Sequence, residues 1–217
     1  MSGVSSVREK LLDTAEALFA DSGYHGVSVR DITTAAGVRV ASINDLFGSK
    51  EQLFQVVIAR RAGSINDDRL SMLEQVEPGL PPKAQLQQIV EAFARPLLSR
   101  SETSDGWRSY LRLISQLSNT RSVVLVLIAD HFNPIALRFI QAIGDAVPGL
   151  DQRQRLVAYQ LMVSSVMSIF ADNYRINVLS ANVYQSSEFE HHYQDLVRYI
   201  SGGIFAMTHH DGQLTVR

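Results

Sequence analysis

The feature that most constrains this chain of 217 residues is an apolar pattern with helical spacing. Near the N-terminus, apolar residues recur three or four positions apart, with charged residues on the opposite face: Val7, Leu11, Leu12, Ala15, Leu18 and Phe19. Because an α-helix has 3.6 residues per turn, this spacing gives one apolar stripe along a helix. The same period recurs along most of the chain, so we predict an all-α fold.

Capping pairs, glycines and prolines divide the pattern into about nine helices. Ser28 and Asp31 form one predicted capping box and Ser49 and Gln52 a second, while Gly37 can end a helix with positive φ. The apolar run 123–129 also fits a buried strand, but its helical flanks and the lack of a strand partner favour a helix. The expected helices cover about 7–23, 28–36, 39–46, 49–76, 83–99, 104–119, 121–144, 152–179 and 187–208.

Two short predicted helices, residues 29–36 and 39–46, flank a turn at Gly37-Val38. A glycine turn between short helices is typical of the helix-turn-helix motif, in which the second helix enters the major groove of DNA. Apolar residues at 32, 35, 38, 43 and 47 are spaced to hold the two helices together. An ordinary helical hairpin has the same spacing, so the pattern alone leaves both interpretations open.

Composition gives no independent support for DNA binding. The formal net charge is −2, and residues 1–61 hold seven basic and seven acidic residues. The chain has no cysteine, no apolar run near the roughly 18 residues of a membrane span, and no apolar leader in its first residues. We therefore expect a soluble cytoplasmic protein without a metal or other cofactor.

Residues 8–54 resemble the N-terminal domain of the tetracycline-repressor (TetR) family over about a fifth of the chain. The matching motifs are A-E-A-L-F at 15–19, G-Y-H-G-V-S-V-R-D-I at 23–32, A-A-G-V at 35–38 and F-G-S-K-E-Q-L-F at 47–54. The resemblance implies a ligand-responsive regulator, by family habit a repressor, which binds a near-palindromic operator as a homodimer. It divides the chain into a DNA-binding domain at 1–62, with the motif at about 28–47, and a ligand-binding and dimerisation domain at 63–217.

By the same resemblance, Arg30 and Thr33 contact phosphate from the second helix, and Lys50 contacts phosphate at the start of the fourth. A helix N-terminus attracts phosphate through its orphan amides and its dipole. On the reading helix, Arg39 has the geometry to bind guanine and Asn44 to bind adenine. The full predicted DNA-binding set is Ser28, Arg30, Thr33, Arg39, Val40, Ser42, Asn44, Asp45 and Lys50.

The pair Asp45-Leu46 departs from the family pattern, which commonly has an aromatic residue or histidine before the phenylalanine at Phe47. An aspartate near phosphates is repelled unless it accepts a hydrogen bond from cytosine. We therefore expect modest affinity, strong salt dependence or an unusual operator. A related scaffold that has lost DNA binding and acts through protein partners is the alternative.

The second part of the chain is expected to form the sensor and the dimer interface. The predicted helix 152–179 is apolar nearly all round, so it must be covered on both sides. Either one side faces its own subunit and the other a partner chain, or the whole helix is buried inside a monomer. Small residues at 164, 165, 168 and 171, and the pair Gly202-Gly203, permit close helix crossing. The family pattern favours a symmetric four-helix interface between these two last helices.

Aromatic and methionine side chains in this part are candidates for lining a cavity for a mainly apolar small-molecule effector, although most aromatic residues in a helical domain are simply core. The candidates are Phe93, Trp107, Tyr110, Phe132, Tyr159, Met162, Phe170 and Tyr174. Polar groups on Arg108, Arg112, His131 and Asn173 lie near them in sequence and could orient such a molecule.

An enzyme is the main alternative from another class. The chain lacks a G-x-S-x-G elbow, a P-loop, H-E-x-x-H and G-x-G-x-x-G. The adjacent pairs at 191–192 and 209–210 point to different faces of a helix, which is unfavourable for holding one metal ion. His192 and Asp195 share a face, and a surface pair explains them better than catalysis. We expect no enzymatic activity.

Overall fold

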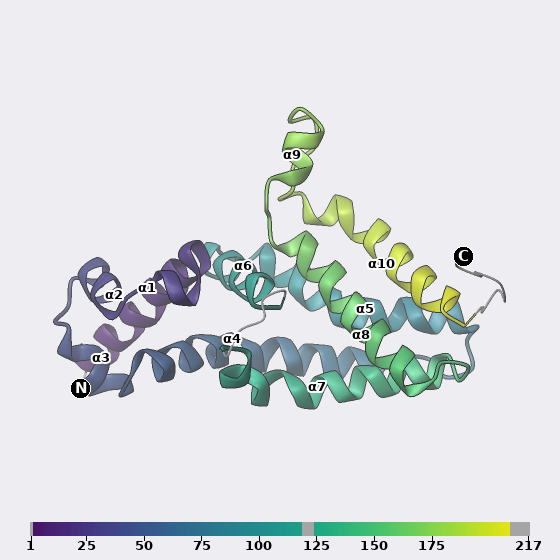
Figure 1. Ribbon diagram of the computed structural model, residues 1–217, viewed down its shortest axis with the longest axis horizontal. Coiled ribbons are helices and arrows are strands. Elements are labelled where there is room, and N and C mark those ends of the chain that lie inside the picture. Colours follow the sequence, from purple (N-terminus) through teal and green to yellow (C-terminus); the bar gives the residue numbers. More distant parts are fainter. Residues whose placement is uncertain (1, 119–123, 209–217) are drawn as a thin grey trace, which may run out of the picture.

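The computed structural model describes residues 2–118 and 124–208, which form ten helices and contain no strand (Figure 1). The prediction of an all-α fold is therefore confirmed. The helices are α1 (Ser2–Gly26), α2 (Val29–Ala36), α3 (Ala41–Phe47), α4 (Lys50–Leu73), α5 (Pro82–Ser101), α6 (Asp105–Ser118), α7 (Val124–Ala146), α8 (Gln152–Phe170), α9 (Arg175–Leu179) and α10 (Phe189–Ala206).

Helices α1 to α3 form a head at one end of the molecule, and α4 extends from it into the body (Figure 1). The head has its own apolar centre, in which the rings of Phe19 and Phe54 meet edge-to-face at 5.1 Å. Gly23 takes φ 69° within α1, close to the predicted end of this helix. A left-handed φ is readily available only to glycine, which explains the residue at this bend.

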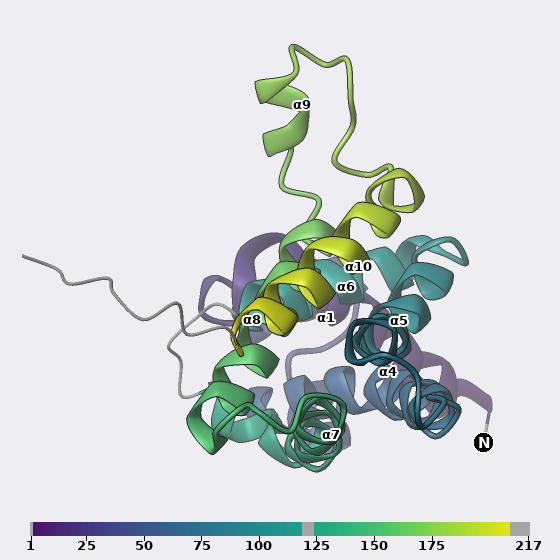
Figure 2. The ribbon, with the colours of Figure 1, turned by 90° about the vertical axis from the view of Figure 1, so that its right-hand side faces the viewer.

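The body is a bundle in which α4, α5 and α7 run side by side, with α6 and α8 packed on them and α10 crossing α5 and α8 (Figures 1 and 2). Its core joins the head core without a break, because α6 also packs against α1. The run for which a strand was the alternative begins helix α7, at Val124, so the preference for a helix is confirmed; residue 123 lies outside the described residues.

The prediction of a single helix over residues 152–179 is wrong. Helix α8 ends at Phe170, and Asp172 and Tyr174 take φ values of 46° and 58° before the short α9 begins. Asn173 Oδ1 accepts a hydrogen bond from Arg175 N at 3.1 Å, a local alternative to continuing the helix. Residues 171–188, here called the arm, project away from the body and return to α10 (Figure 2). Because α8 and α9 replace one predicted helix, the described residues form ten helices instead of the expected nine or so.

No helix in the described part of the chain is long and apolar enough to cross a membrane.

Candidate DNA-binding head and ligand cavity

The turn between α2 and α3 has the geometry that the sequence predicted. Ser28 Oγ accepts from Asp31 N at 3.1 Å and Asp31 Oδ2 accepts from Ser28 N at 2.8 Å, so the predicted capping box is confirmed. The Ser28 hydroxyl, which donates to Asp31 Oδ2 at 2.7 Å, and the Ser28 amide together lower the pKa of Asp31. Gly37 takes φ 63°, and the amides of Gly37 and Val38 donate to Thr34 O and Thr33 O, respectively. This pair of bonds is a Schellman motif, which ends α2 and redirects the chain.

Helix α3 presents a polar outer face and an apolar inner face. Ile43 and Phe47 are buried against the head, whereas Arg39, Asn44 and Asp45 are exposed and Ser42 is half-buried. Val40 immediately precedes the helix, and its apolar side chain is 55% exposed to solvent. Such a face can enter a DNA groove, where a short apolar group meets a thymine methyl.

The three predicted phosphate contacts occupy different environments. Arg30 is exposed. Thr33 is buried, and its hydroxyl donates to Val29 O at 3.0 Å, so it faces the interior of the head rather than the solvent expected for it. Lys50 is the first residue of α4 and donates from Nζ to Tyr24 O at 2.6 Å while lying over the Tyr24 ring; burial lowers its pKa.

The start of α4 is capped by Ser49, whose Oγ accepts from Gln52 N at 3.2 Å, one bond of the predicted reciprocal pair. Lys10, which the sequence did not single out, reaches the turn from α1. Its Nζ lies 3.8 Å from the position that a Cβ on Gly37 would take.

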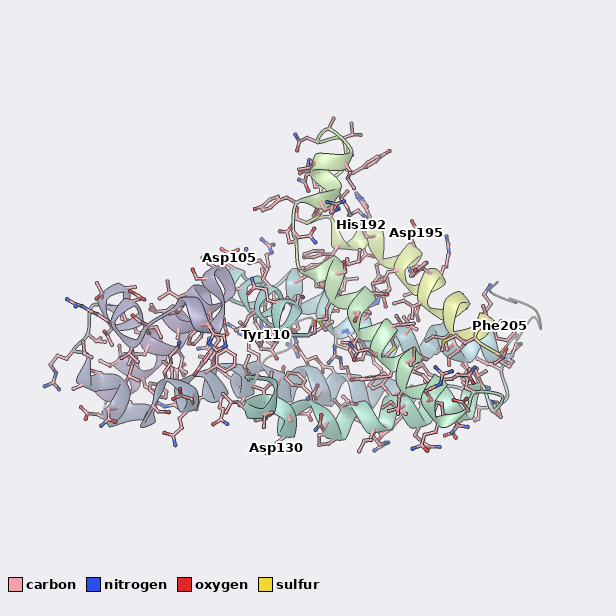
Figure 3. All side chains as sticks on the ribbon, viewed as in Figure 1. Asp105, Tyr110, Asp130, His192, Asp195 and Phe205 are labelled. Carbon is pink, nitrogen blue, oxygen red and sulfur yellow. The ribbon has the colours of Figure 1, made fainter. Side chains whose placement is uncertain are left out.

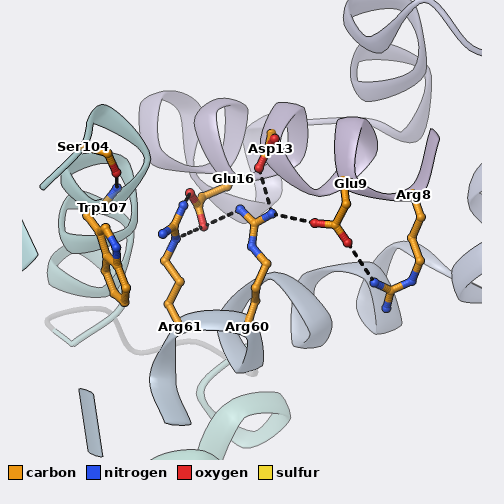
Figure 4. Close-up of polar contacts among 8 residues, drawn as sticks. All are labelled: Arg8, Glu9, Asp13, Glu16, Arg60, Arg61, Ser104 and Trp107. Carbon is orange, nitrogen blue, oxygen red and sulfur yellow. Dashed lines mark hydrogen bonds and ion pairs between the residues drawn. The ribbon is translucent and has the colours of Figure 1, made fainter. Parts of the chain in front are cut away.

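Several of the acidic residues in the head form ion pairs with arginines of α4, so their charges are neutralised within the protein (Figure 4). Glu16, only 2% exposed, accepts two hydrogen bonds from Arg61, at 2.7 and 2.8 Å, and one from Arg60 at 3.1 Å. Arg60 also binds Asp13 at 2.7 Å and lies 3.5 Å from Glu9. These carboxylates are therefore paired between α1 and α4, away from the α2–α3 turn.

The same network joins the head to the body. The Arg61 guanidinium lies 4.6 Å from the centroid of the Trp107 ring on α6 (Figure 4). Further along α6, Gln116 Nε2 donates to Ala20 O at 2.7 Å, and Arg112 lies 3.4 Å from Asp21. Helix α6 thus makes polar contacts with α1 through Arg112 and Gln116.

A cavity of about 270 Å³ lies in the body among α4, α5, α6, α7 and α8. Three of the eight predicted effector contacts line it: Phe93, Phe132 and Tyr159. The remaining lining is mainly aliphatic, with polar groups on Ser118, Asn133 and Gln160. Its size is close to the lower end of the range for small-molecule sites, so a compact ligand fits best.

The other five candidates lie elsewhere. Tyr110, Met162 and Phe170 are core residues, and burial raises the pKa of Tyr110. Trp107 is held between Arg61 and Arg100. Tyr174 is 65% exposed on the arm.

Among the described residues that line this cavity, the charged one is Arg69, which was not among the residues predicted from the sequence. Arg69 is 3% exposed; its Nε donates to Phe93 O at 2.9 Å and its guanidinium stacks 3.8 Å from the Phe93 ring centroid. Its Nη2 has no hydrogen-bond partner among the described residues. A signal for it was present: Arg69 stands on the apolar stripe of α4, between the buried Ile65 and Leu73.

The polar groups proposed to orient a ligand do not line this cavity. Arg108 and Arg112 border a different, polar hollow of about 600 Å³ between α6 and the arm, and His131 borders a hollow beside α3. In the first hollow the arginines already have carboxylate neighbours, Asp105 and Asp21, each at 3.4 Å. Asn173 belongs to the arm, where it caps Arg175.

The His192–Asp195 pair also has an ordinary structural explanation. His192 lies 2.9 Å from Gln185 O through Nε2, and Asp195 lies 3.7 Å from Arg198. Figure 3 shows both residues on α10, remote from Tyr110 in the bundle. Over residues 2–118 and 124–208, no three His, Asp or Glu side chains are grouped to hold a metal ion.

Sequence comparisons match both parts of the chain. A profile described as "Bacterial regulatory proteins, tetR family" matches residues 11–57, and one described as "Tetracyclin repressor-like, C-terminal domain" matches residues 91–203. The HTH-type transcriptional repressor KstR2 of Rhodococcus jostii is 37% identical over 89 residues, which are 41% of this chain and 42% of that protein. The HTH-type transcriptional regulator BetI of Rhizobium meliloti is 26% identical over 125 residues, 57% of this chain and 60% of that protein.

The chain thus aligns with about two to three fifths of the length of these relatives. The crystal structure of the transcriptional regulator FadR from Bacillus subtilis, in complex with stearoyl-CoA, covers 90% of this chain and 98% of its own, with a TM-score of 0.59 and 15% identity. At that identity the match shows a shared fold. The C-terminal profile covers more than half of the chain, and with the N-terminal profile it establishes that the protein belongs to the tetracycline-repressor family of bacterial transcription regulators.

Proposed function

We propose that this protein is a sequence-specific DNA-binding transcriptional repressor, which binds its operator as a homodimer and is released from it by a mainly apolar small molecule. The observation that carries the proposal is the position of α4. This helix begins beside the α2–α3 turn at Lys50 and reaches the cavity at Arg69, so one rigid element belongs to both sites. The family-wide profiles at 11–57 and 91–203 support a division of labour near residue 62, within α4.

Operator binding is tested by selecting genomic fragments with the purified protein at low salt. A sequence reader enriches one short inverted repeat. Arg39→Ala should then weaken binding by about 1–3 kcal/mol and relax specificity at one base pair. Lys83→Ala, an exposed basic residue on α5, serves as the matched control and should leave binding unchanged. Fragments recovered without any shared repeat would contradict DNA reading and favour a scaffold that acts through protein partners.

Release requires that a ligand change the separation of the two reading helices from about 34–36 Å, one turn of DNA. The cavity touches two helices that hold the head. Ile114 and Leu117 line it from α6, whose neighbouring Gln116 donates to Ala20 O of α1, and Arg69 lines it from α4. A ligand with different affinities for the two arrangements of these helices shifts the population between them. Mobility-shift titrations with candidate ligands measure this effect directly.

The homodimer is supported by apolar side chains that the subunit leaves uncovered. Leu156 and Leu161 on α8 are 49% and 56% exposed, and Tyr199 on α10, 74% exposed, borders a shallow hollow with Ser164 and Ser168 of α8. A Cβ added at Gly202 or Gly203 would meet nothing within 4 Å, which leaves room for a partner backbone. The arm adds Val178, Leu179, Val183 and Tyr184, each more than 60% exposed. We assign a second copy of this chain as the partner of both surfaces.

Sedimentation velocity tests the dimer. Leu161→Glu should convert the dimer into a monomer, because it places a charge at the centre of the proposed apolar interface. Leu137→Glu provides the matched control, since Leu137 is 66% exposed on α7, a helix outside the proposed interface of α8, α10 and the arm. Equal sedimentation of wild type and Leu161→Glu would place the interface elsewhere.

A further inference from the structure

Among the described residues, the effector cavity contains a positive charge, Arg69, with no negative partner. No aspartate or glutamate is among its lining residues in the described chain. The carboxylate next to Arg69 in sequence, Asp68, points elsewhere and binds Arg100 at 2.7 Å. Burial lowers the pKa of Arg69 to about 10, which still leaves the guanidinium charged at neutral pH. A buried cation without a counter-charge is costly, and proteins normally pair such groups.

The groups around Arg69 do not neutralise it. The nearest titratable side chains are Tyr159 and Tyr110, and burial raises the pKa of both, so both stay uncharged at neutral pH. The Tyr110 hydroxyl also has no hydrogen-bond partner among the described residues. One end of the guanidinium is fixed by Phe93, through its carbonyl and its ring, while Nη2 remains available as a donor.

We propose that the effector is a compact organic acid whose carboxylate binds Arg69 and whose apolar body fills the cavity lined by Phe93, Phe132 and Tyr159. This inference rests on the proposed function, because it names the chemical class of its effector. A guanidinium that is already oriented by Phe93 binds a carboxylate oxygen through a charge-assisted hydrogen bond, which is stronger than a neutral one, above all in a dry site. The aliphatic lining from α6 and α7 supplies the remaining affinity through apolar burial.

The test is calorimetric titration of the full-length protein with hexanoic, octanoic, decanoic, phenylbutyric and cyclohexylbutyric acids, each compared with its primary amide. The amide has nearly the same shape and no charge. At least one acid should bind the wild type about tenfold more tightly than its amide, or better. Arg69→Met should remove that preference, so that acid and amide bind within about twofold of each other.

Two further variants separate charge from packing. Arg69→Lys keeps the charge and should retain part of the preference for the acid. Arg100→Met makes the same substitution at an arginine that has its own carboxylate and does not line the cavity, and it should retain the full preference. The proposal is overturned if no acid is preferred to its amide by the wild type, or if the preference survives in Arg69→Met.

The titrations contain no DNA, so their outcome is independent of operator binding. An acid that binds should also lower operator affinity of the wild type in a mobility shift, and should not do so for Arg69→Met. Failure of the wild type to retain any operator would contradict the proposed function while leaving the measured preference for the acid intact.

Discussion

Two arginine sites on α4, Arg61 and Arg69, differ chiefly in their hydrogen-bond partners. Arg61 and Arg69 both lie near an aromatic ring, at 4.6 Å from Trp107 and 3.8 Å from Phe93. Arg61 also has a buried carboxylate, Glu16, on two hydrogen bonds, whereas Arg69 has a single backbone carbonyl. The charge of Arg61 is paired with a carboxylate, and its contacts join α1, α4 and α6. The charge of Arg69 is unpaired among the described residues, and it lies where the body has a cavity.

The difference indicates separate roles for two residues of the same type. Removing one partner of a complete buried ion pair leaves an uncompensated charge, which is strongly destabilising. Replacing an arginine that has no ionic partner has two opposing effects on the free energy of unfolding. The loss of a buried charge stabilises the fold, whereas the loss of the arginine's remaining contacts destabilises it. Stability measurements therefore discriminate a structural arginine from one kept for binding.

The largest effect is expected for Glu16→Gln. The change leaves Arg60 and Arg61 without their shared buried carboxylate, and the free energy of unfolding should fall by about 3 kcal/mol. Urea unfolding followed by circular dichroism measures it. Glu9→Gln is the control, because Glu9 is 55% exposed and 3.5 Å from Arg60, and it should cost less than about 0.5 kcal/mol. Equal losses in the two variants would show that the network contributes nothing as a buried unit.

A smaller effect is expected for Gly106→Ala on α6. Its new Cβ would lie 2.5 Å from Arg61 Nη2, which donates to Glu16 Oε1 at 2.8 Å and would have to shift, so we expect a loss of about 1 kcal/mol. Gly63→Ala is the matched control on α4, where a Cβ meets nothing within 4 Å. That variant should gain about 0.5 kcal/mol from helix propensity. The same urea titration measures both, and a gain in Gly106→Ala would show that Arg61 moves without cost.

The smallest change is expected for Arg69→Met in the absence of any ligand. The lost hydrogen bond to Phe93 O and the lost ring contact are offset by the removal of a buried charge. Its free energy of unfolding should stay within about 1 kcal/mol of the wild type. A loss as large as that of Glu16→Gln would make Arg69 a structural residue and erase the contrast between the sites.

The helix ends around the α2–α3 turn could be predicted from the sequence because their signals are local. The Ser28–Asp31 box and Gly37 each determine a helix end within a few residues, and the structure has both. The body could be predicted only as helical, and one helix was extended too far. Asp172 and Tyr174 take left-handed backbone conformations, and the apolar period continues past them without a glycine or proline to mark the break.

The cavity could not be derived from composition, because aromatic residues in the core and in the lining look alike in sequence. Phe93 and Tyr159 line it while Tyr110 and Phe170 belong to the core, and the distinction depends on contacts between helices distant in the chain. Arg69 is the exception. A charged residue at a position where the helical period predicts a buried apolar one indicates a possible site.

The continuity of α4 has a geometric consequence. From Arg69 to Lys50 the helix advances about 28 Å, at 1.5 Å per residue. A tilt of about 5° around its Arg69 end would move Lys50 sideways by about 2.5 Å over that length. In a symmetric pair the two displacements add to as much as about 5 Å, a sizeable part of the ~34 Å pitch that separates successive major grooves. In the proposed dimer, a tilt of α4 by a few degrees would therefore be enough to put the two heads out of step with the double helix.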